Sequence, residues 1–155
     1  MPVQTTIPSV SAIREFVGKE LGVSDWIQID QQRINDFAQA TDDHQWIHCD
    51  AERAARESPF GTTVAHGYLT LALAPTLLRE IVTVEGMTSA LNAGCEKVRL
   101  STPVLAGARL RMSASLANAR RIPGSGMRTT LSLTFEIEGE EKPACVARVH
   151  YIYFD

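Results

Sequence analysis

The stretch "GYLTLALAPTLL", residues 67–78, contains no charged side chain. Apolar residues would cover every face of the helix that it forms, without the polar stripe of a surface helix. We therefore expect protein to surround this helix on all sides. Pro75 falls inside the stretch, removes one backbone donor and should kink the helix. The helix is expected to run out near residues 84–86.

The residues that follow this helix have the pattern of strands. Apolar and polar side chains alternate over residues 109–116, 131–137 and 147–153. A period of two is typical of strands with one wet face, as found in antiparallel sheets. The less regular stretch "SALNAGCEKVRL", residues 89–100, predicts a fourth strand.

Turn-forming residues separate these strands, in "IPGSG" (122–126) and "EGEEKP" (138–143). One apolar helix with about four long antiparallel strands indicates an α+β domain whose curved sheet wraps the helix. A small sheet covered on one side leaves an edge or a face free for a partner, so a homodimer is expected.

Two aspartates predict helix starts before the apolar helix. Asp30 is a plausible N-cap for a helix in which Ile34 and Ala38 lie on one buried face. Asp50 is a plausible cap for "AERAARES", residues 51–58. The segment between these helices should therefore be a loop held at both ends.

Length and composition exclude several classes of protein. The 155 residues fit one domain, residues 1–155, and the net charge is −3 with scattered Lys and Arg, which argues against a nucleic-acid partner. Cys49, Cys95 and Cys145 form no C-x-x-C pair, so a disulfide framework is not expected and a reducing compartment fits. There is no signal-peptide pattern and no apolar run long enough to span a membrane. We expect a cytoplasmic protein.

The stretch "TDDHQWIHCD", residues 41–50, concentrates polar side chains in the predicted loop. Asp43 and His48 could both turn inward there, while Trp46 and Ile47 anchor the backbone in the core. A carboxylate and an imidazole that converge on one water molecule form an acid/base pair. The alternatives are helix caps and solvated turn residues. A metal site is less favoured, because the loop supplies no third ligand at a standard spacing.

His66 and Gly67 stand where the apolar helix begins. The first amides of a helix lack intrahelical partners and carry the positive end of its dipole. A glycine there lets a ligand approach the backbone, which suits a carbonyl oxygen that becomes negative during a reaction. Alternatively, Gly67 only relieves crowding, and His66 or Thr63 caps the helix. If the helix amide at Gly67 binds such an oxygen and Asp43 and His48 form an acid/base pair, the chain has the groups needed to add water across a double bond conjugated to a carbonyl.

Three segments resemble one protein family. "FAQATDDHQWIHCDAERAA" (37–55) is similar to its signature [YF]-x-x-x-[ST]-G-D-x-N-P-[LIV]-H, and "FGTTVAHGYLTLAL" (60–73) contains its A-H-G-[MFY]. "EKVRLSTPVLAGARLRM" (96–112) is similar to V-R-F-x-x-P-V-x-x-G-x-x-[LV]. The chain thus resembles the MaoC-like, (R)-specific enoyl-CoA hydratases of the hotdog fold. With "SDWIQID" (24–30) upstream, it resembles the NodN-like subgroup in particular, over residues 17–153.

The resemblance implies a fold and an activity. The fold is a curved antiparallel sheet of about five strands around a long central helix, in a homodimer with its pockets at the interface. The activity is reversible addition of water to trans-2-enoyl-CoA, giving the (R)-3-hydroxyacyl thioester, with acyl carrier protein as a possible carrier and no metal or redox cofactor. A hotdog thioesterase, or an acyl-thioester-binding protein that has lost its activity, is the alternative.

The resemblance also assigns residues. Asp43 and His48 take the catalytic positions, and the Gly67 amide takes the position that binds the thioester carbonyl. The following residues are expected to support the site or line its pocket: Gln45, His66, Trp46, Tyr68 and Leu69. Candidates for the phosphates of coenzyme A are Lys97, Arg99, Arg109, Arg111, Arg121 and Arg128, although strand arginines are usually just solvated.

Asp42 departs from the family pattern, which has glycine before the catalytic aspartate. If that position needs a positive φ angle, aspartate can adopt it less easily than glycine. An inward-pointing Asp42 would add a second negative charge beside Asp43. We expect Asp42 to face solvent or to cap a backbone amide.

Overall fold

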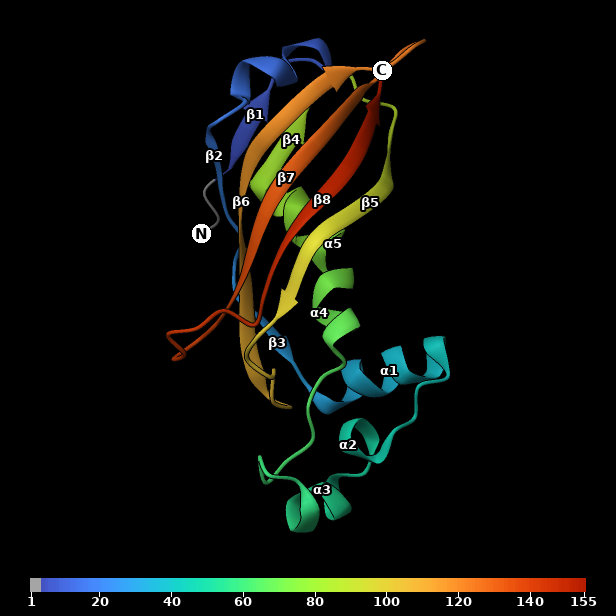
Figure 1. Ribbon diagram of the computed structural model, residues 1–155, viewed down its shortest axis with the longest axis vertical. Coiled ribbons are helices and arrows are strands. Elements are labelled where there is room, and N and C mark those ends of the chain that lie inside the picture. Colours follow the sequence, from blue (N-terminus) through green and yellow to red (C-terminus); the bar gives the residue numbers. More distant parts are fainter. Residues whose placement is uncertain (1–3) are drawn as a thin grey trace.

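The computed structural model describes residues 4–155 and is built on a long, curved antiparallel sheet (Figure 1). Its long strands lie in the order β6-β7-β8-β5, and β6 also pairs with the short strands β2 and β3. The strands are β2 (Glu20–Val23), β3 (Ile27–Ile29), β5 (Ser89–Leu100), β6 (Ala108–Arg121), β7 (Met127–Ile137) and β8 (Cys145–Phe154). The expected α+β class, the antiparallel sheet and both predicted turns are confirmed.

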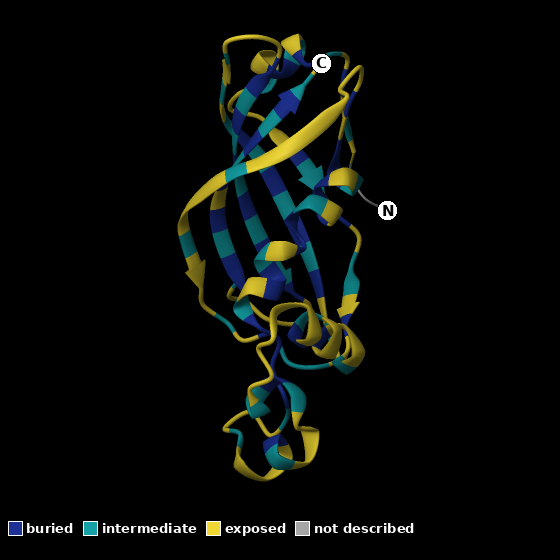
Figure 2. Ribbon diagram, turned by 90° about the vertical axis from the view of Figure 1, so that its right-hand side faces the viewer, coloured by how far each residue is buried: buried dark blue, intermediate teal, exposed yellow. Residues whose placement is uncertain are grey.

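Alternation of side chains determines which face of the sheet is buried. In β7 every second residue is buried, including Leu131, Leu133 and Phe135, and the residues between them are half-buried. β5 differs, because nearly all of its residues are exposed (Figure 2). It pairs with β8 on one side and forms the edge of the sheet.

Helices α4 (Gly67–Ala72) and α5 (Ala74–Ile81) together form the apolar helix along the sheet (Figure 1). The predicted interruption is confirmed: it falls at Leu73, and Pro75 occupies the first turn of α5, where no amide hydrogen is needed. Leu77 and Ile81 are fully buried in the core, whereas Tyr68 is 74% exposed. The expectation that protein surrounds every face was therefore wrong for a single chain, which covers only one side of the helix.

The helix ends at Ile81, earlier than the predicted residues 84–86. Residues Val82–Val84 form strand β4, which pairs in parallel with β1 (Thr5–Ile7). β-Branched side chains favour the extended backbone, and a neighbouring strand from the N-terminal region supplies the hydrogen bonds. That partner lies far away in sequence, so the apolar pattern alone could not show it.

The remaining helices lie at one end of the sheet, beyond β3 (Figure 1). They are α1 (Gln31–Thr41), α2 (Trp46–Cys49) and α3 (Ala51–Glu57), and a 3-10 helix, η1 (Ser11–Phe16), lies near the other end. Both predicted caps are confirmed: Asp30 accepts a hydrogen bond from the Arg33 amide, and Asp50 accepts one from the Arg53 amide. Among the described residues, no helix is long and apolar enough to cross a membrane.

The three cysteines are free thiols, and Cys145 at the start of β8 is fully buried. Burial, and to a lesser degree Cys95, raises the pKa of the Cys145 thiol from 9.0 to about 11. The unfolded chain therefore loses this proton near pH 9, while the folded chain holds it until about pH 11. The stability that depends on the protonated thiol is complete below pH 9 and is lost between these two values.

Cys145→Ala is expected to remove this pH dependence. At pH 8 the substitution should destabilise the protein through lost packing. At pH 10.5 the thiol ionises more readily in the unfolded chain, which should lower the free energy of unfolding of the wild type by about 2 kcal/mol. The variant has no thiol at this position and does not lose this stability. Urea unfolding at both pH values measures the difference in the free energy of unfolding between the wild type and the variant. A difference that is the same at both pH values would contradict the raised pKa of Cys145.

Candidate active site

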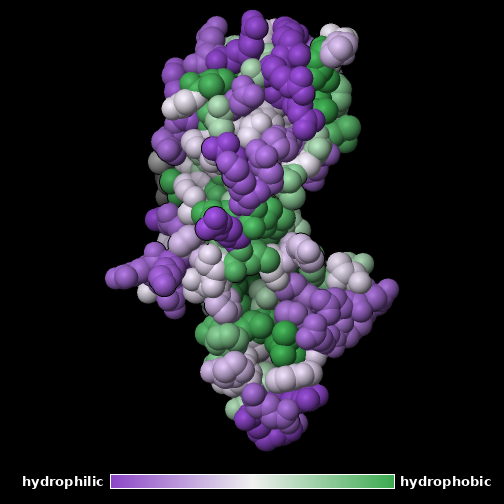
Figure 3. Space-filling model, viewed as in Figure 1, coloured by the Kyte–Doolittle hydropathy of each residue, from purple (hydrophilic) through white to green (hydrophobic). Residues whose placement is uncertain are grey.

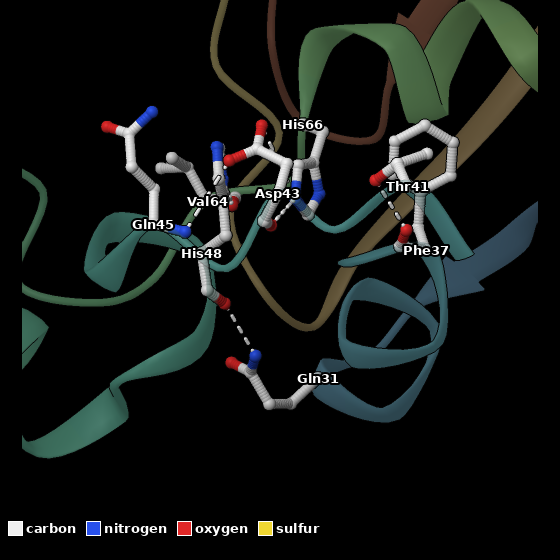
Figure 4. A network of polar contacts seen from close by, with 8 residues as sticks. All are labelled: Gln31, Phe37, Thr41, Asp43, Gln45, His48, Val64 and His66. Carbon is white, nitrogen blue, oxygen red and sulfur yellow. Dashed lines mark hydrogen bonds and ion pairs between the residues drawn. The ribbon is translucent and has the colours of Figure 1, made fainter. Parts of the chain in front are cut away.

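The segment that joins α1 to α2 brings the predicted acid/base residues to the end of the central helix (Figure 4). Asp42 ends α1 with φ 58° and ψ 20°, in the left-handed region, and its side chain is exposed. The position that the family pattern fills with glycine therefore has a positive φ in this chain, and Asp42 faces solvent as expected. The turn redirects the chain so that Asp43 approaches the loop before α4.

His48 is the buried member of the pair, 8% exposed on the single-turn helix α2. The sequence showed no helix signal here, and the helix consists of only one turn. The Nδ1 atom of His48 lies 2.6 Å from the carbonyl oxygen of Val64. A carbonyl can only accept, so Nδ1 carries the hydrogen and Nε2 carries the lone pair. This tautomer leaves Nε2 able to take a proton.

A polar brace holds the backbone of His48. Gln31 of α1 donates from Nε2 to the His48 carbonyl over 2.7 Å, and the Thr63 hydroxyl donates to Gln31 Oε1. The brace thus joins α1, α2 and the loop that leads to α4. Neither Gln31 nor the Val64 carbonyl was predicted from the sequence as part of the site.

Asp43 is the accessible member, with its side chain 48% exposed. Its Oδ1 atom is 3.5 Å from the Gln45 amide, and its Oδ2 atom is 4.0 Å from Nε2 of His66. A carboxylate oxygen of Asp43 and one ring nitrogen each of His48 and His66 lie within 4.8 Å of one another. The carboxylate is thus near both imidazoles and open to solvent, which suits a group that handles water.

These three side chains also have the composition of a metal site. However, the rings of His48 and His66 are stacked, with centroids 3.8 Å apart and planes inclined by 23°. Stacked rings direct their nitrogen lone pairs side by side rather than toward one ion. One nitrogen of each ring also contacts a backbone carbonyl. The geometry favours proton transfer over metal coordination.

Gly67 is the first residue of α4, immediately after the buried His66. A methyl group at this position would lie 2.5 Å from Cδ1 of Leu100, so a side chain there would have to displace Leu100. An open cleft of about 280 Å³ runs beside the glycine. It is lined by Ala65, Gly67, Thr70, Leu100, Ser101, Thr102, Pro103, Val104 and Ala144.

An apolar groove continues along the central helix from Tyr68. Two adjoining hollows of about 370 and 360 Å³ share Pro75, Asn92 and Tyr151 and lie between the helix and strands β5 and β8. We call the two together the helix groove. Exposed apolar side chains such as Tyr68 and Leu91 stand at its rim.

Of the residues predicted to support the site or line its pocket, Tyr68 lies at the helix groove, and Gln45, Trp46 and Leu69 do not. Gln45 is exposed and its side chain points away from the cluster (Figure 4). Trp46 is half-buried under the guanidinium group of Arg53, at 4.3 Å, rather than in the core. Leu69 is buried in the core, so Tyr68 is the only one of these pocket candidates that lines the groove.

Two of the candidate phosphate ligands are already paired with glutamates. Arg109 contacts Glu138 and Arg111 contacts Glu136, and both guanidinium groups lie over the Trp26 ring. A space-filling view shows hydrophilic side chains over much of this face, with apolar ones exposed along its middle and at its upper right edge (Figure 3).

Comparison with known proteins identifies the family and the fold. Residues 13–136 match the family described as "MaoC like domain". The 3-hydroxyacyl-thioester dehydratase Z of Mycobacterium tuberculosis is 47% identical, over 95% of this chain and 98% of its own length. Nodulation protein N of Rhizobium meliloti is 45% identical, over 90% and 87%. The R-hydratase PhaJ1 from Pseudomonas aeruginosa superimposes with a TM-score of 0.71 at 21% identity, covering 100% of this chain and 90% of that one.

The structural likeness extends over the whole sheet and its central helix, which confirms the hotdog fold. The family match covers most of the chain and includes the loop of Asp43 and His48 as well as the start of α4. The chain belongs to the MaoC-like dehydratase family and is an enzyme of the hydro-lyase class.

Proposed function

We propose that the protein catalyses the reversible addition of water to trans-2-enoyl thioesters and forms (R)-3-hydroxyacyl thioesters. The observation that carries the proposal is the tautomer of His48, whose hydrogen bond to Val64 leaves Nε2 basic in a ring that has one nitrogen within 4.8 Å of the Asp43 carboxylate. The relative named 3-hydroxyacyl-thioester dehydratase supports the same class of reaction.

The residues would divide the reaction as follows. Nε2 of His48 removes one proton from water while the water oxygen bonds to C3 of the substrate. Asp43 accepts a hydrogen bond from the second hydrogen of that water, which stays on the oxygen as the hydroxyl hydrogen of the product. The electron pair of the double bond moves toward the thioester carbonyl, whose oxygen becomes negative. The amide of Gly67, at the positive end of α4, stabilises this oxygen. The imidazolium of His48 then returns the proton to C2, so that one water molecule is added in total.

The helix groove is the proposed site for the acyl chain. Its lining is mainly apolar, and it starts at Tyr68, next to the glycine that would hold the carbonyl. An apolar tail buried there would gain about 25 cal/mol for each Å² removed from water. The carrier, coenzyme A or acyl carrier protein, would remain outside on the accessible side of Asp43.

A synthetic trans-2-enoyl-CoA tests the proposal. Hydration removes the absorbance of the conjugated enoyl thioester without releasing a thiol. Release of free thiol would instead indicate a thioesterase. Binding of the thioester without turnover would indicate a degenerate binding protein. Either of these two results would reject the hydratase assignment.

We also propose that the enzyme is a homodimer formed through β5. This strand is 12 residues long, lies at the edge of the sheet and is exposed on both faces. Such an edge offers unpaired backbone groups to another chain. A second copy that pairs with it antiparallel would also cover the exposed side of α4, including Tyr68. That arrangement would surround the apolar helix as its sequence predicts.

Leu91→Glu should convert the dimer to a monomer. Leu91 is 58% exposed on β5, and a carboxylate there would have to be buried without a partner at the interface. Light scattering coupled to size-exclusion chromatography measures the mass. Val17→Glu is the control, because Val17 is also an exposed apolar residue but lies before β2. A monomeric wild type, or a dimeric Leu91→Glu variant, would contradict the proposed interface.

The expected absence of a metal leads to another prediction. If Asp43, His48 and His66 transfer protons and position groups rather than bind an ion, exhaustive treatment with a chelator should leave turnover within about twofold of the untreated enzyme. Added Zn²⁺ should not increase turnover. A chelated enzyme that is inactive and recovers with Zn²⁺ would instead make the cluster a metal centre.

A further inference from the structure

His66 is buried more deeply than either proposed acid/base residue, although no step of the reaction uses it. It directly precedes α4 and is 3% exposed. Its ring lies between Phe37, at 4.9 Å and 54°, and His48, at 3.8 Å and 23° between ring centroids and planes. It does not cap the helix with its side chain, so the capping role considered from the sequence does not account for it.

The hydrogen bonds of His66 determine its tautomer. Nε2 lies 2.9 Å from the carbonyl oxygen of Asp43 and must donate to it (Figure 4). Nδ1 therefore carries the lone pair, and it is buried without a hydrogen-bond partner among residues 4–155. The proton thus sits on opposite nitrogens in the two stacked rings: on Nδ1 in His48 and on Nε2 in His66.

These contacts connect all parts of the site. Asp43 follows the left-handed residue Asp42, and within residues 4–155 its carboxylate makes two long contacts, with the Gln45 amide at 3.5 Å and with Nε2 of His66 at 4.0 Å. The bond from His66 to the Asp43 carbonyl therefore fixes the backbone that carries the carboxylate. The stack limits rotation of the His48 ring about its Cβ–Cγ bond. Gly67 follows His66 directly in the chain. The Gly67 amide, which is the proposed oxyanion donor, is therefore positioned by the same buried residue.

We propose that His66 is a positioning residue that fixes Asp43 by its hydrogen bond and His48 by its stacked ring. The proposal rests on the proposed hydratase function for its effect on the rate. It does not require His66 to contact substrate.

Two variants separate the two contacts. His66→Phe keeps a stacked ring but loses the hydrogen bond, and His66→Gln keeps an N–H donor but loses the ring. Each should lower kcat by about tenfold and change KM by less than about twofold, since ground-state binding is not altered. Thermal unfolding of both variants identifies any general loss of the fold.

A double-mutant cycle tests whether His66 acts through Asp43. In an Asp43→Asn background, the His66→Phe substitution should lower kcat by less than about twofold, because the group that it positions is already disabled. An equal loss in both backgrounds would indicate a merely structural role and overturn the proposal. Wild-type rates in both His66 variants would also overturn it, while a slow Asp43→Asn enzyme would leave the hydratase function standing.

Nitrogen NMR of labelled histidines tests the positioning independently of activity. The four histidines should include one ring fixed with its proton on Nδ1, His48, and one fixed with its proton on Nε2, His66. Because the stacked ring of His66 holds His48 Nδ1 against the Val64 carbonyl, His66→Gln should let the His48 ring rotate away from that acceptor, and its signals should then average between tautomers. Averaged signals in the wild type, or an unchanged His48 ring in His66→Gln, would overturn the proposal even if the enzyme did not hydrate enoyl thioesters.

Discussion

Asp43→Asn and His48→Gln are each expected to lower hydratase turnover by about a hundredfold or more, with the fold intact. Asparagine keeps the shape of Asp43 but lacks the negative charge that strengthens the hydrogen bond accepted from water. Glutamine at position 48 cannot take up and return a proton. Positioned acid/base groups contribute about 10²–10⁴ in rate, so the loss should appear mainly in kcat. Steady-state hydration of an enoyl-CoA measures it.

Neighbouring residues provide matched controls for this prediction. Asp42 and His44 are exposed and stand in the same loop, one on each side of Asp43. Asp42→Asn and His44→Gln make the same chemical changes outside the cluster and should retain rates within about threefold of wild type. Comparable losses of turnover in the two control variants would mean that any polar substitution in this loop lowers the activity. Full activity in Asp43→Asn or His48→Gln would remove the acid/base assignment.

Leu77→Ala should destabilise the protein by about 2–5 kcal/mol. Leu77 lies on α5, is fully buried, and belongs to the core between this helix and the sheet. Truncation removes the burial of three carbon atoms and leaves a cavity that the rigid sheet cannot close. Urea unfolding measures the change in the free energy of unfolding.

Leu71→Ala is the matched control, with the same chemistry on the same helical segment. Leu71 lines the helix groove and is only half-buried. Its truncation should cost less than about 1 kcal/mol in a single chain. If the two variants lose equal stability at concentrations where the protein is monomeric, α5 is not the centre of the core.

The sequence predicted the sheet well, because alternation is a local pattern. Residues 131–137 alternate in composition, and the same residues alternate in burial on β7. The end of the apolar helix was predicted less well, since Val82–Val84 owe their extended form to β1, over 70 residues away in sequence. The all-round apolar character of α4 was recognised, but a single chain does not supply the partner that would cover Tyr68.

For the site, the sequence indicated the side chains but not the contacts that hold them. Asp43 and His48 could be selected because their side chains have acid/base chemistry. The Val64 carbonyl that determines the tautomer of His48 has no sequence signature, because every residue has a carbonyl. The same applies to the bond between His66 and the Asp43 backbone. The single domain over residues 1–155, the cytoplasmic location and the absence of cofactors stay predictions.

The central claim is that this site adds water to a carbon–carbon double bond of an acyl thioester. Turnover of trans-2-butenoyl-CoA in oxygen-18 water, followed by mass spectrometry of the intact products, tests it most directly. We predict a 3-hydroxybutanoyl thioester that retains its coenzyme A and carries the label on the C3 hydroxyl group, in the (R) configuration. Label in a free carboxylic acid together with released coenzyme A, or no labelled product, would contradict the account.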